Sequence, residues 1–199
     1  MQDFQLHYPD ISLVLTLGDR PIDLIAEGVD CVVRAGVPAS SAVLVARRVG
    51  SFAWVTCAAP TYLARHGTPG ALSDLDRHRL VAFQTGKTGR ATDWHFIVDG
   101  ADHAVSVNAS LSVNDTDAYV TCGLEGLGLV RIADYLASPH LASGCLIKVL
   151  PQYASPVVPL SVIYPQDRHL PHTVRAFVEW IAARLHTLQS VALAPSQRQ

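Results

Sequence analysis

The apolar positions at the start of the chain predict two strands joined by a short helix. Over residues 11–17, aliphatic side chains alternate with serine, valine and threonine, so both sides are only weakly polar, as in strands covered on both faces. Pro21 can open a helix at its first turn, and Gly28 can end one. Residues 29–34 then return to a strand pattern. We expect a β-α-β unit, which requires parallel strands and a right-handed crossover.

The rest of the chain also alternates between strand and helix patterns, which predicts an α/β protein. The clearest helix follows Pro171, where apolar side chains recur at helical spacing and charged ones lie between them. Residues 190–199 are small and polar, and we expect a frayed tail there. The other expected elements are strands at residues 43–49, 52–57, 80–83, 94–98, 104–113, 127–132 and 160–164, and helices at residues 60–66, 72–77, 116–125 and 133–136.

The composition indicates a folded protein without a nucleic-acid surface in this chain. Its 199 residues are 49% hydrophobic, enough for one large core or two smaller ones. The 15 basic residues nearly balance the 17 acidic ones and are scattered, whereas phosphate binding requires a clustered basic surface. We expect the adjacent Arg47 and Arg48 to be outward charges at the end of a strand.

Two further features bear on the cellular compartment. No apolar run approaches the ~18 residues of a membrane span. The start of the chain also lacks the basic segment and apolar stretch of a signal peptide, so we expect a cytoplasmic protein that does not bind a membrane. Cys31, Cys57, Cys122 and Cys145 are far apart, form no C-x-x-C pair and sit among apolar neighbours, which predicts buried, reduced thiols.

The motifs of catalysis and metal binding are missing from the sequence. There is no G-x-S-x-G elbow, no H-E-x-x-H pair and no P-loop. His169 and His172 are close in sequence, but Leu170 and Pro171 between them indicate a loop entering a helix, where we expect solvated side chains rather than a metal site. We therefore expect no catalytic residues, no metal and no cofactor.

Two polar or glycine-rich clusters have structural explanations. Gly123, Gly126 and Gly128 follow a helix and lead into a strand, the reverse of the order in a dinucleotide site, which favours a helix C-terminus and a tight turn. Asp115 and Asp117 stand at the start of the same helix, where carboxylates cap free N–H groups. Paired carboxylates for acid–base chemistry are the alternative for these two residues.

A candidate ligand site follows from the ends of the strands. Ligands of open parallel sheets bind outside the carboxyl ends of the strands, and Arg34 closes a strand just before Gly36. Its guanidinium could grip a carboxylate, although an ordinary ion pair with a neighbouring aspartate fits the pattern equally well. The preceding strand ends at the same edge, and a second lobe would supply a strand end and a helix start. The complete predicted set is Gly18, Asp19, Arg34, Gly36, Phe83, Thr85, Asn114, Asp115 and Thr116.

Four stretches, in this order and spacing, resemble the effector-binding domain of LysR-type bacterial transcription regulators. They are YPDISLVLTLGDRPIDLIAEGVDCVVRAG, LVARRVGSFAWVTCAAPTYLARHGTP, GLGLVRIADYL and YPQDRHLPHTVRAFVEWIAARL. The resemblance implies a two-lobed fold like that of type 2 periplasmic binding proteins, with two crossovers between the lobes and an effector in the cleft. The lobes would comprise residues 1–57 with 157–199, and residues 58–156.

The resemblance also implies parts that these residues do not include. Such regulators bind DNA through a separate N-terminal winged helix-turn-helix and form homodimers or higher homo-oligomers. The first strand of the family's domain is missing, and residues 1–7 match only the tail of its first helix. That strand would lie between those at residues 11–17 and 29–34, so we expect a loosened first lobe.

Two other functions are compatible with a two-lobed scaffold. A solute-binding protein of a transport system shares the fold but needs an export signal. An enzyme would need catalytic groups that converge in the cleft. The arginine, hydroxyl groups and aromatic ring of the candidate site favour a small aromatic or carboxylated metabolite as effector.

Overall fold

The chain divides into two compact units in the computed structural model, which describes residues 1–18, 22–38, 41–85, 90–166 and 170–192. The first unit consists of Met1–Leu17, Ile22–Phe52 and Val158–Gln199, and the second of Ala53–Val157 with the short Gly18–Pro21. Pro21, which was expected to open a helix, lies outside the described residues. In the part of the chain that is described, no helix has both the length and the apolar character that crossing a membrane requires.

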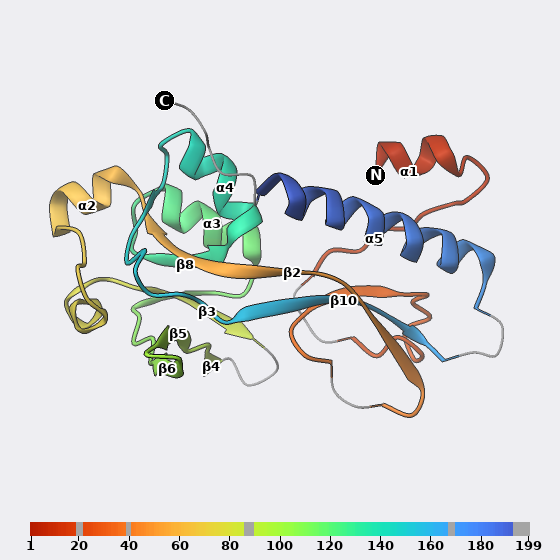
Figure 1. Ribbon diagram of the computed structural model, residues 1–199, viewed down its shortest axis with the longest axis horizontal. Helices are drawn as coiled ribbons and strands as arrows, with labels where there is room; N and C mark the ends of the chain where they lie inside the picture. Colours follow the sequence, from red (N-terminus) through yellow and green to blue (C-terminus); the bar gives the residue numbers. More distant parts are fainter. Residues whose placement is uncertain (19–21, 39–40, 86–89, 167–169, 193–199) are drawn as a thin grey trace. The chain divides into compact units, whose positions relative to one another are not determined.

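The first unit is built around one long helix and three strands (Figure 1). Strand β1 runs antiparallel to β10, with Val32 opposite Ile163 and Ala35 opposite Leu160. The other neighbour of β10 is β2. The elements of this unit are α1 (Gln2–His7), β1 (Val32–Ala35), the first part of β2 (Leu44–Ala58), most of β10 (Val157–Pro165) and α5 (His172–Ala192).

Helix α5 forms the core of the first unit through the apolar stripe that its sequence predicts. Val174 and Val178 are buried and pack with Val49 and Val162 of the strands. Helix α1 also packs against α5. The fully buried ring of Phe4 meets the rings of Phe177 and Trp180 edge-on. The predicted helix after Pro171 is therefore confirmed.

The β-α-β prediction for the start of the chain is wrong. Residues 11–17 form no strand, residues 24–28 form turns rather than a helix, and β1 pairs antiparallel with the distant β10. The physical reason is visible in the exposure of the side chains, because Val14 is 89% exposed and Leu17 is 82% exposed. An apolar alternation favours a strand only where a second strand supplies backbone partners and a surface covers the side chains.

The second unit combines a small parallel strand pair with an antiparallel sheet. Strands β3 and β7 run parallel, with Val81 opposite Leu111 and Phe83 opposite Val113. The end of β2 pairs antiparallel with β8 and β9. The elements are α2 (Pro60–His66), the 3₁₀ helix η1 (Leu72–Arg77), β3 (Val81–Thr85), β4 (Arg90–Ala91), β5 (Trp94–Val98), β6 (Ala101–Val105), β7 (Leu111–Val113), α3 (Thr116–Leu124), β8 (Val130–Ala133), α4 (Asp134–Ala142) and β9 (Ile147–Lys148).

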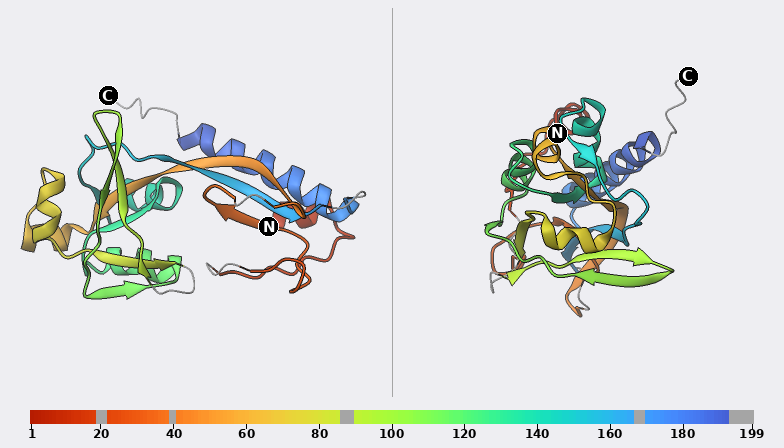
Figure 2. Two further views of the ribbon diagram at one scale, coloured as in Figure 1. Left: turned by 90° about the horizontal axis from the view of Figure 1, so that it is seen from below. Right: turned by 90° about the vertical axis from the view of Figure 1, so that its left-hand side faces the viewer.

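Two hydrophobic clusters lie on opposite faces of β8 in this unit. Val130 and Ile132 pack with Tyr119 of α3 and Ala137 of α4. Figure 1 shows α3 and α4 on one side of β8 and the hairpin of β5 and β6 on the other, and Figure 2 shows this hairpin as a long two-stranded ribbon. The cluster on the hairpin side includes Phe96, and Tyr153 packs against it.

The structure confirms the cap at Asp115 and the glycine turn after α3, whereas Asp117 lies in the first turn of α3 and no capping hydrogen bond of its side chain is found among the described residues. Asp115 caps α3, because its carboxylate accepts a hydrogen bond of 2.8 Å from the N–H of Ala118. Gly126 ends the following turn with a φ of +68°, a conformation that favours glycine. A Cβ atom at Gly123 would lie 2.5 Å from a methyl group of Val130, so this glycine allows close packing of α3 on β8.

Several predicted boundaries need correction. The two strands expected at residues 43–49 and 52–57 are one continuous β2, and the strand expected at 104–113 is divided between β6 and β7. Helix α4 runs through Pro139, well past its predicted end. Cys145 is exposed rather than buried, whereas Cys57 is buried as predicted, and burial raises the pKa of the Cys57 thiol to about 12.

Candidate functional site

The predicted site residues of the second unit lie at one edge of the β3 and β7 pair. Because the two strands are parallel, their carboxyl ends point to the same edge. Thr85 ends β3 there, and Asn114 directly follows β7. Helix α3 begins two residues later, at Thr116. The strand ends and the helix start therefore lie at the same edge, as the sequence predicts. We call the place formed by Thr85, Asn114 and Thr116 the β3–β7 edge.

The β3–β7 edge offers hydrogen-bonding groups and one aromatic ring. The hydroxyl groups of Thr85 and Thr92 lie 3.2 Å apart, and Asn114 is exposed. Phe83 is half-buried, with its ring centroid 5.4 Å from that of Tyr119. The Asp115 carboxylate serves as the cap of α3, which leaves hydroxyl and amide groups to contact a ligand. Such a lining suits a polar metabolite that has a flat apolar part.

Tyr119 fixes this edge to the rest of the second unit. Its ring is 4% exposed, and its hydroxyl donates to the carbonyl of Val81 at 3.2 Å and accepts from the N–H of Arg131 at 3.1 Å. Burial is the main cause of a raised pKa for this hydroxyl. One oxygen atom therefore joins α3 to both β3 and β8.

Arg34 and Gly36 of the first unit lie on and just after a strand that runs antiparallel to its neighbour, whereas the site argument expected a parallel strand. Arg34 is half-buried in β1, opposite Ser161 of β10. Gly36 donates its N–H to the carbonyl of Pro159 at 2.9 Å and has a φ of +97°. Gly18, which is grouped with the second unit, is exposed. Asp19 lies outside the described residues, as does His169. That these residues meet the β3–β7 edge remains a prediction.

The backbone conformation at position 36 explains why glycine is found there. A Cβ atom there would have no neighbour within 4 Å in the described structure, so crowding does not require glycine. The positive φ does, because the left-handed region is unfavourable for residues that carry a Cβ atom.

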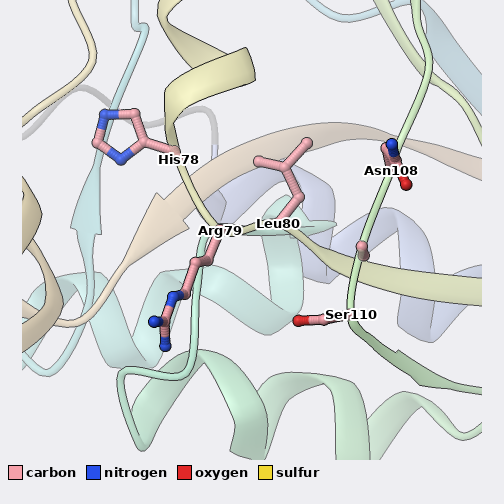
Figure 3. Close-up of a pocket in the computed structure, with 6 residues that line it drawn as sticks. His78, Arg79, Leu80, Asn108 and Ser110 are labelled. Carbon is pink, nitrogen blue, oxygen red and sulfur yellow. The ribbon is translucent and has the colours of Figure 1, made fainter.

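A cavity of about 370 Å³ lies at the opposite end of the parallel strands. It is lined in part by Leu80, which directly precedes β3, and by Ser110, which directly precedes β7. Figure 3 shows the side chains of His78 and Arg79 pointing away from Asn108. Since ligands of parallel strands bind at the carboxyl ends, this position at the amino ends does not favour an effector site.

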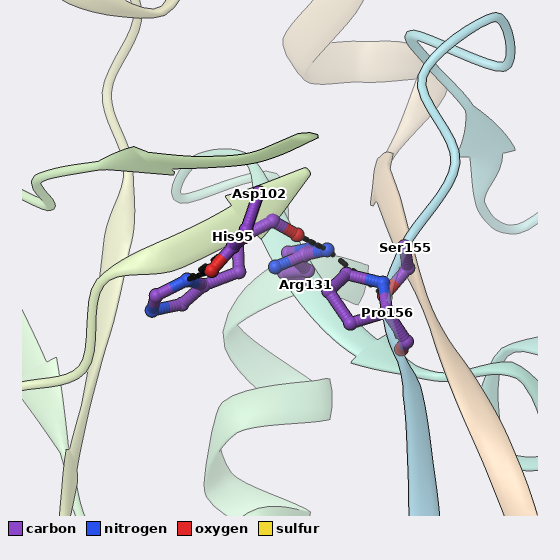
Figure 4. Close-up of polar contacts among 5 residues, drawn as sticks. All are labelled: His95, Asp102, Arg131, Ser155 and Pro156. Carbon is purple, nitrogen blue, oxygen red and sulfur yellow. Dashed lines mark hydrogen bonds and ion pairs between the residues drawn. The ribbon is translucent and has the colours of Figure 1, made fainter. Parts of the chain in front are cut away.

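A second cavity of about 370 Å³ surrounds a residue that our sequence interpretation overlooked. Arg131 of β8 is only 6% exposed, and its Nη2 donates to the carbonyl of His95 and, at 3.0 Å, to the hydroxyl of Ser155 (Figure 4). The guanidinium carbon lies 4.4 Å from the centre of the Phe96 ring. Burial lowers the pKa of Arg131 to about 10, so the side chain stays cationic at neutral pH.

The sequence did contain a signal for this residue. Arg131 stands between Val130 and Ile132 in an apolar strand pattern, and a charged residue in a buried strand is almost always held by polar partners. The partners themselves lie on β5 and near residue 155, and the distance along the chain hides them from a local pattern.

Comparison with known proteins identifies the class to which this fold belongs. Residues 1–186 match the family described as the LysR substrate binding domain, and the chain belongs to this family. It has the two-lobed, periplasmic-binding-protein-like fold of LysR regulatory domains. The family consists of domains of transcription regulators, so the interpretations as a transport protein or an enzyme are not supported.

Among individual relatives, the HTH-type transcriptional regulator YhjC of Escherichia coli K12 is 34% identical over 182 residues, which are 92% of this chain and 60% of YhjC. The solved regulatory domain of CrgA from Neisseria meningitidis is 27% identical, with a TM-score of 0.81 over 92% of this chain and 89% of that structure. Full-length AphB of Vibrio cholerae is 26% identical, with a TM-score of 0.75 over 92% of this chain and 61% of that structure. The chain thus spans about three fifths of the full-length regulators YhjC and AphB.

Proposed function

We propose that this chain is the part of a LysR-type regulator that binds a small-molecule effector and passes the signal to a DNA-binding part of the same regulator. The observation that carries the proposal is the family match over residues 1–186. The regulator would act in the cytoplasm as a homodimer or a higher homo-oligomer, as the family resemblance implies.

The proposed effector site combines the β3–β7 edge with the predicted residues of the first unit. The edge supplies the hydroxyl group of Thr85, the amide of Asn114 and the ring of Phe83. Arg34 would bind a carboxylate if it faces this edge. The effector would then be a small aromatic or carboxylated metabolite, held between the predicted lobes of residues 1–57 with 157–199 and residues 58–156.

A thermal-shift screen of metabolites tests this proposal directly. A ligand at a hundred times its Kd stabilises the folded state by about 2.7 kcal/mol, so an effector should raise the melting temperature of the chain clearly. Each hit is then titrated against the variants Thr85→Val and Asn114→Leu, which alter exposed side chains at the β3–β7 edge.

The matched control is Thr68→Val, the same substitution at an exposed position of a loop in the second unit. We expect each of the two edge variants to bind an effector about two- to tenfold more weakly than the wild type, since the loss of one hydrogen bond costs about 0.5–1.5 kcal/mol. The control should bind normally. Effectors that bind all three variants equally would refute a site at the β3–β7 edge.

A further inference from the structure

We propose that the cavity around Arg131 is a second ligand site, which binds a small carboxylate attached to a flat apolar group. This Arg131 cavity lies wholly within the second unit and is lined in part by Trp54, Phe96, Asp134, Lys148 and Tyr153. It would bind its ligand independently of the proposed effector site.

The charge of Arg131 is incompletely compensated. Both of its side-chain hydrogen bonds in the described structure start from Nη2 and go to neutral oxygens, on His95 and Ser155. The buried Nε atom has no hydrogen-bond partner, and among the described residues no carboxylate forms an ion pair with this guanidinium. A buried cation without an anionic partner is unfavourable, and a carboxylate that enters the cavity would supply one.

The carboxylates that could act as internal counter-ions are engaged elsewhere. The negative charge of Asp102 favours the charged form of Arg131, but the Asp102 carboxylate contacts the imidazole of His95 at 2.9 Å. Asp134 lines the cavity, but one carboxylate oxygen accepts from the N–H of Ala53 at 3.2 Å and the other from the N–H of Tyr135 at 2.8 Å. Lys148, which is exposed, adds a second positive charge to the lining. Of the ionised side chains that line the cavity, Arg131 and Lys148 are positive and Asp134 is negative, and this excess of positive charge in the lining favours an anion.

The remaining walls suit a flat apolar group. Phe96 stacks on Arg131, and the ring of Tyr153 meets that of Phe96 edge-on, with 6.3 Å between centroids. Trp54 on the lining is 37% exposed, so part of its indole is available to a ligand. The volume of about 370 Å³ is within the range of small-molecule sites. Aromatic walls beside a cation fit an aromatic carboxylate better than a fully polar anion such as phosphate.

The Arg131 cavity is separate from the β3–β7 edge. Side chains alternate along β8, so Arg131 points to the face opposite Val130 and Ile132. Those two residues pack in the same cluster as Tyr119 and Phe83, on the side where the β3–β7 edge lies. Binding at the two places can therefore be tested with different variants.

The experiment is a calorimetric and thermal-shift titration of the chain with phenylacetate, with phenylacetamide as the neutral analogue and inorganic phosphate as a compact anion. We expect phenylacetate to bind and to raise the melting temperature, and phenylacetamide and phosphate to have at least about tenfold weaker effects, because a hydrogen bond to a charged group contributes more than a neutral one. No response to phenylacetate at about 10 mM would overturn the proposal. A response to phosphate as strong as that to phenylacetate would overturn the assignment to an aromatic carboxylate.

Variants then locate the binding. Arg131→Met keeps most of the side-chain volume and should reduce phenylacetate affinity at least about tenfold. Lys148→Gln, at an exposed position where folding is little affected, should weaken binding by a smaller factor, and it keeps the test valid if Arg131→Met fails to fold. Arg77→Met, at the exposed Arg77 of η1, is the matched control and should bind as the wild type does.

Thr85→Val distinguishes this proposal from the proposed effector site. It should leave phenylacetate affinity unchanged even if it weakens an effector found in the metabolite screen. Loss of phenylacetate binding in Thr85→Val, with normal binding in Lys148→Gln, would place the ligand at the β3–β7 edge and overturn a second site.

Discussion

Replacing Tyr119 with phenylalanine removes one oxygen atom that holds three elements of the second unit together. The hydroxyl donates to the carbonyl of Val81 and accepts from the N–H of Arg131, and its residue is 4% exposed. Without it, the N–H of Arg131 becomes a buried donor without a partner, which costs about 1–3 kcal/mol, and the bond to Val81 is lost as well, at about 1 kcal/mol. We expect Tyr119→Phe to lower the free energy of unfolding by about 2–4 kcal/mol.

Urea denaturation followed by circular dichroism measures this change as a lower midpoint with an unchanged slope. Tyr153→Phe is the matched control in the same unit, since Tyr153 is half-buried against Phe96 and its hydroxyl makes no hydrogen bond within the described ranges. It should stay within about 0.5 kcal/mol of the wild type. If the two variants were equally stable, the hydroxyl of Tyr119 would not be the link between α3, β3 and β8 that its geometry indicates.

Four further predictions concern the backbone and the thiols. Gly36→Ala should cost about 1–2 kcal/mol because of the positive φ, whereas Gly18→Ala, at an open position without a positive φ, should be nearly neutral in the same denaturation assay. Cys145 should react with a thiol reagent in the folded protein, whereas Cys57 should react only after unfolding; equal labelling rates would contradict their different burial. Because burial raises the pKa of Cys57 from its ordinary 9.0 to about 12, the unfolded state loses this proton first, and stability should fall as the pH rises above about 9. Amide hydrogen exchange should be fast at residues 13–17, which form no strand, and slow in β8, and similar protection in both would contradict the structure.

The sequence predicts best the elements in which apolar residues recur at a regular period over the whole length. The stripe of α5 and the strand at Trp94–Val98 appear where expected, because each has a regular apolar period over its whole length. Residues 11–17 have a similarly apolar pattern but form no strand. A local pattern shows which residues could be covered, and it does not show whether another segment covers them.

The same limit applies to the candidate sites. Thr85 and Asn114 could be predicted to share an edge, because parallel strands necessarily end at the same side of a sheet. The Arg131 cavity could not be predicted in this way, since its lining comes from segments between Ala53 and Ser155 that only folding brings together. An unusual charge in an apolar strand was the one local sign of it.

The division of the chain also determines which parts can fold during synthesis. Nearly all of the second unit is one uninterrupted stretch, Ala53–Val157, whereas the first unit is assembled from three separate pieces. Strand β1 must wait for β10, and the Val49 cluster must wait for α5, and both β10 and α5 follow the second unit in the chain. The contacts of the first unit therefore close long loops and form late, while the second unit can be complete before them. Nascent chains arrested once Val157 has left the ribosome should already contain a folded second unit, before the first unit forms.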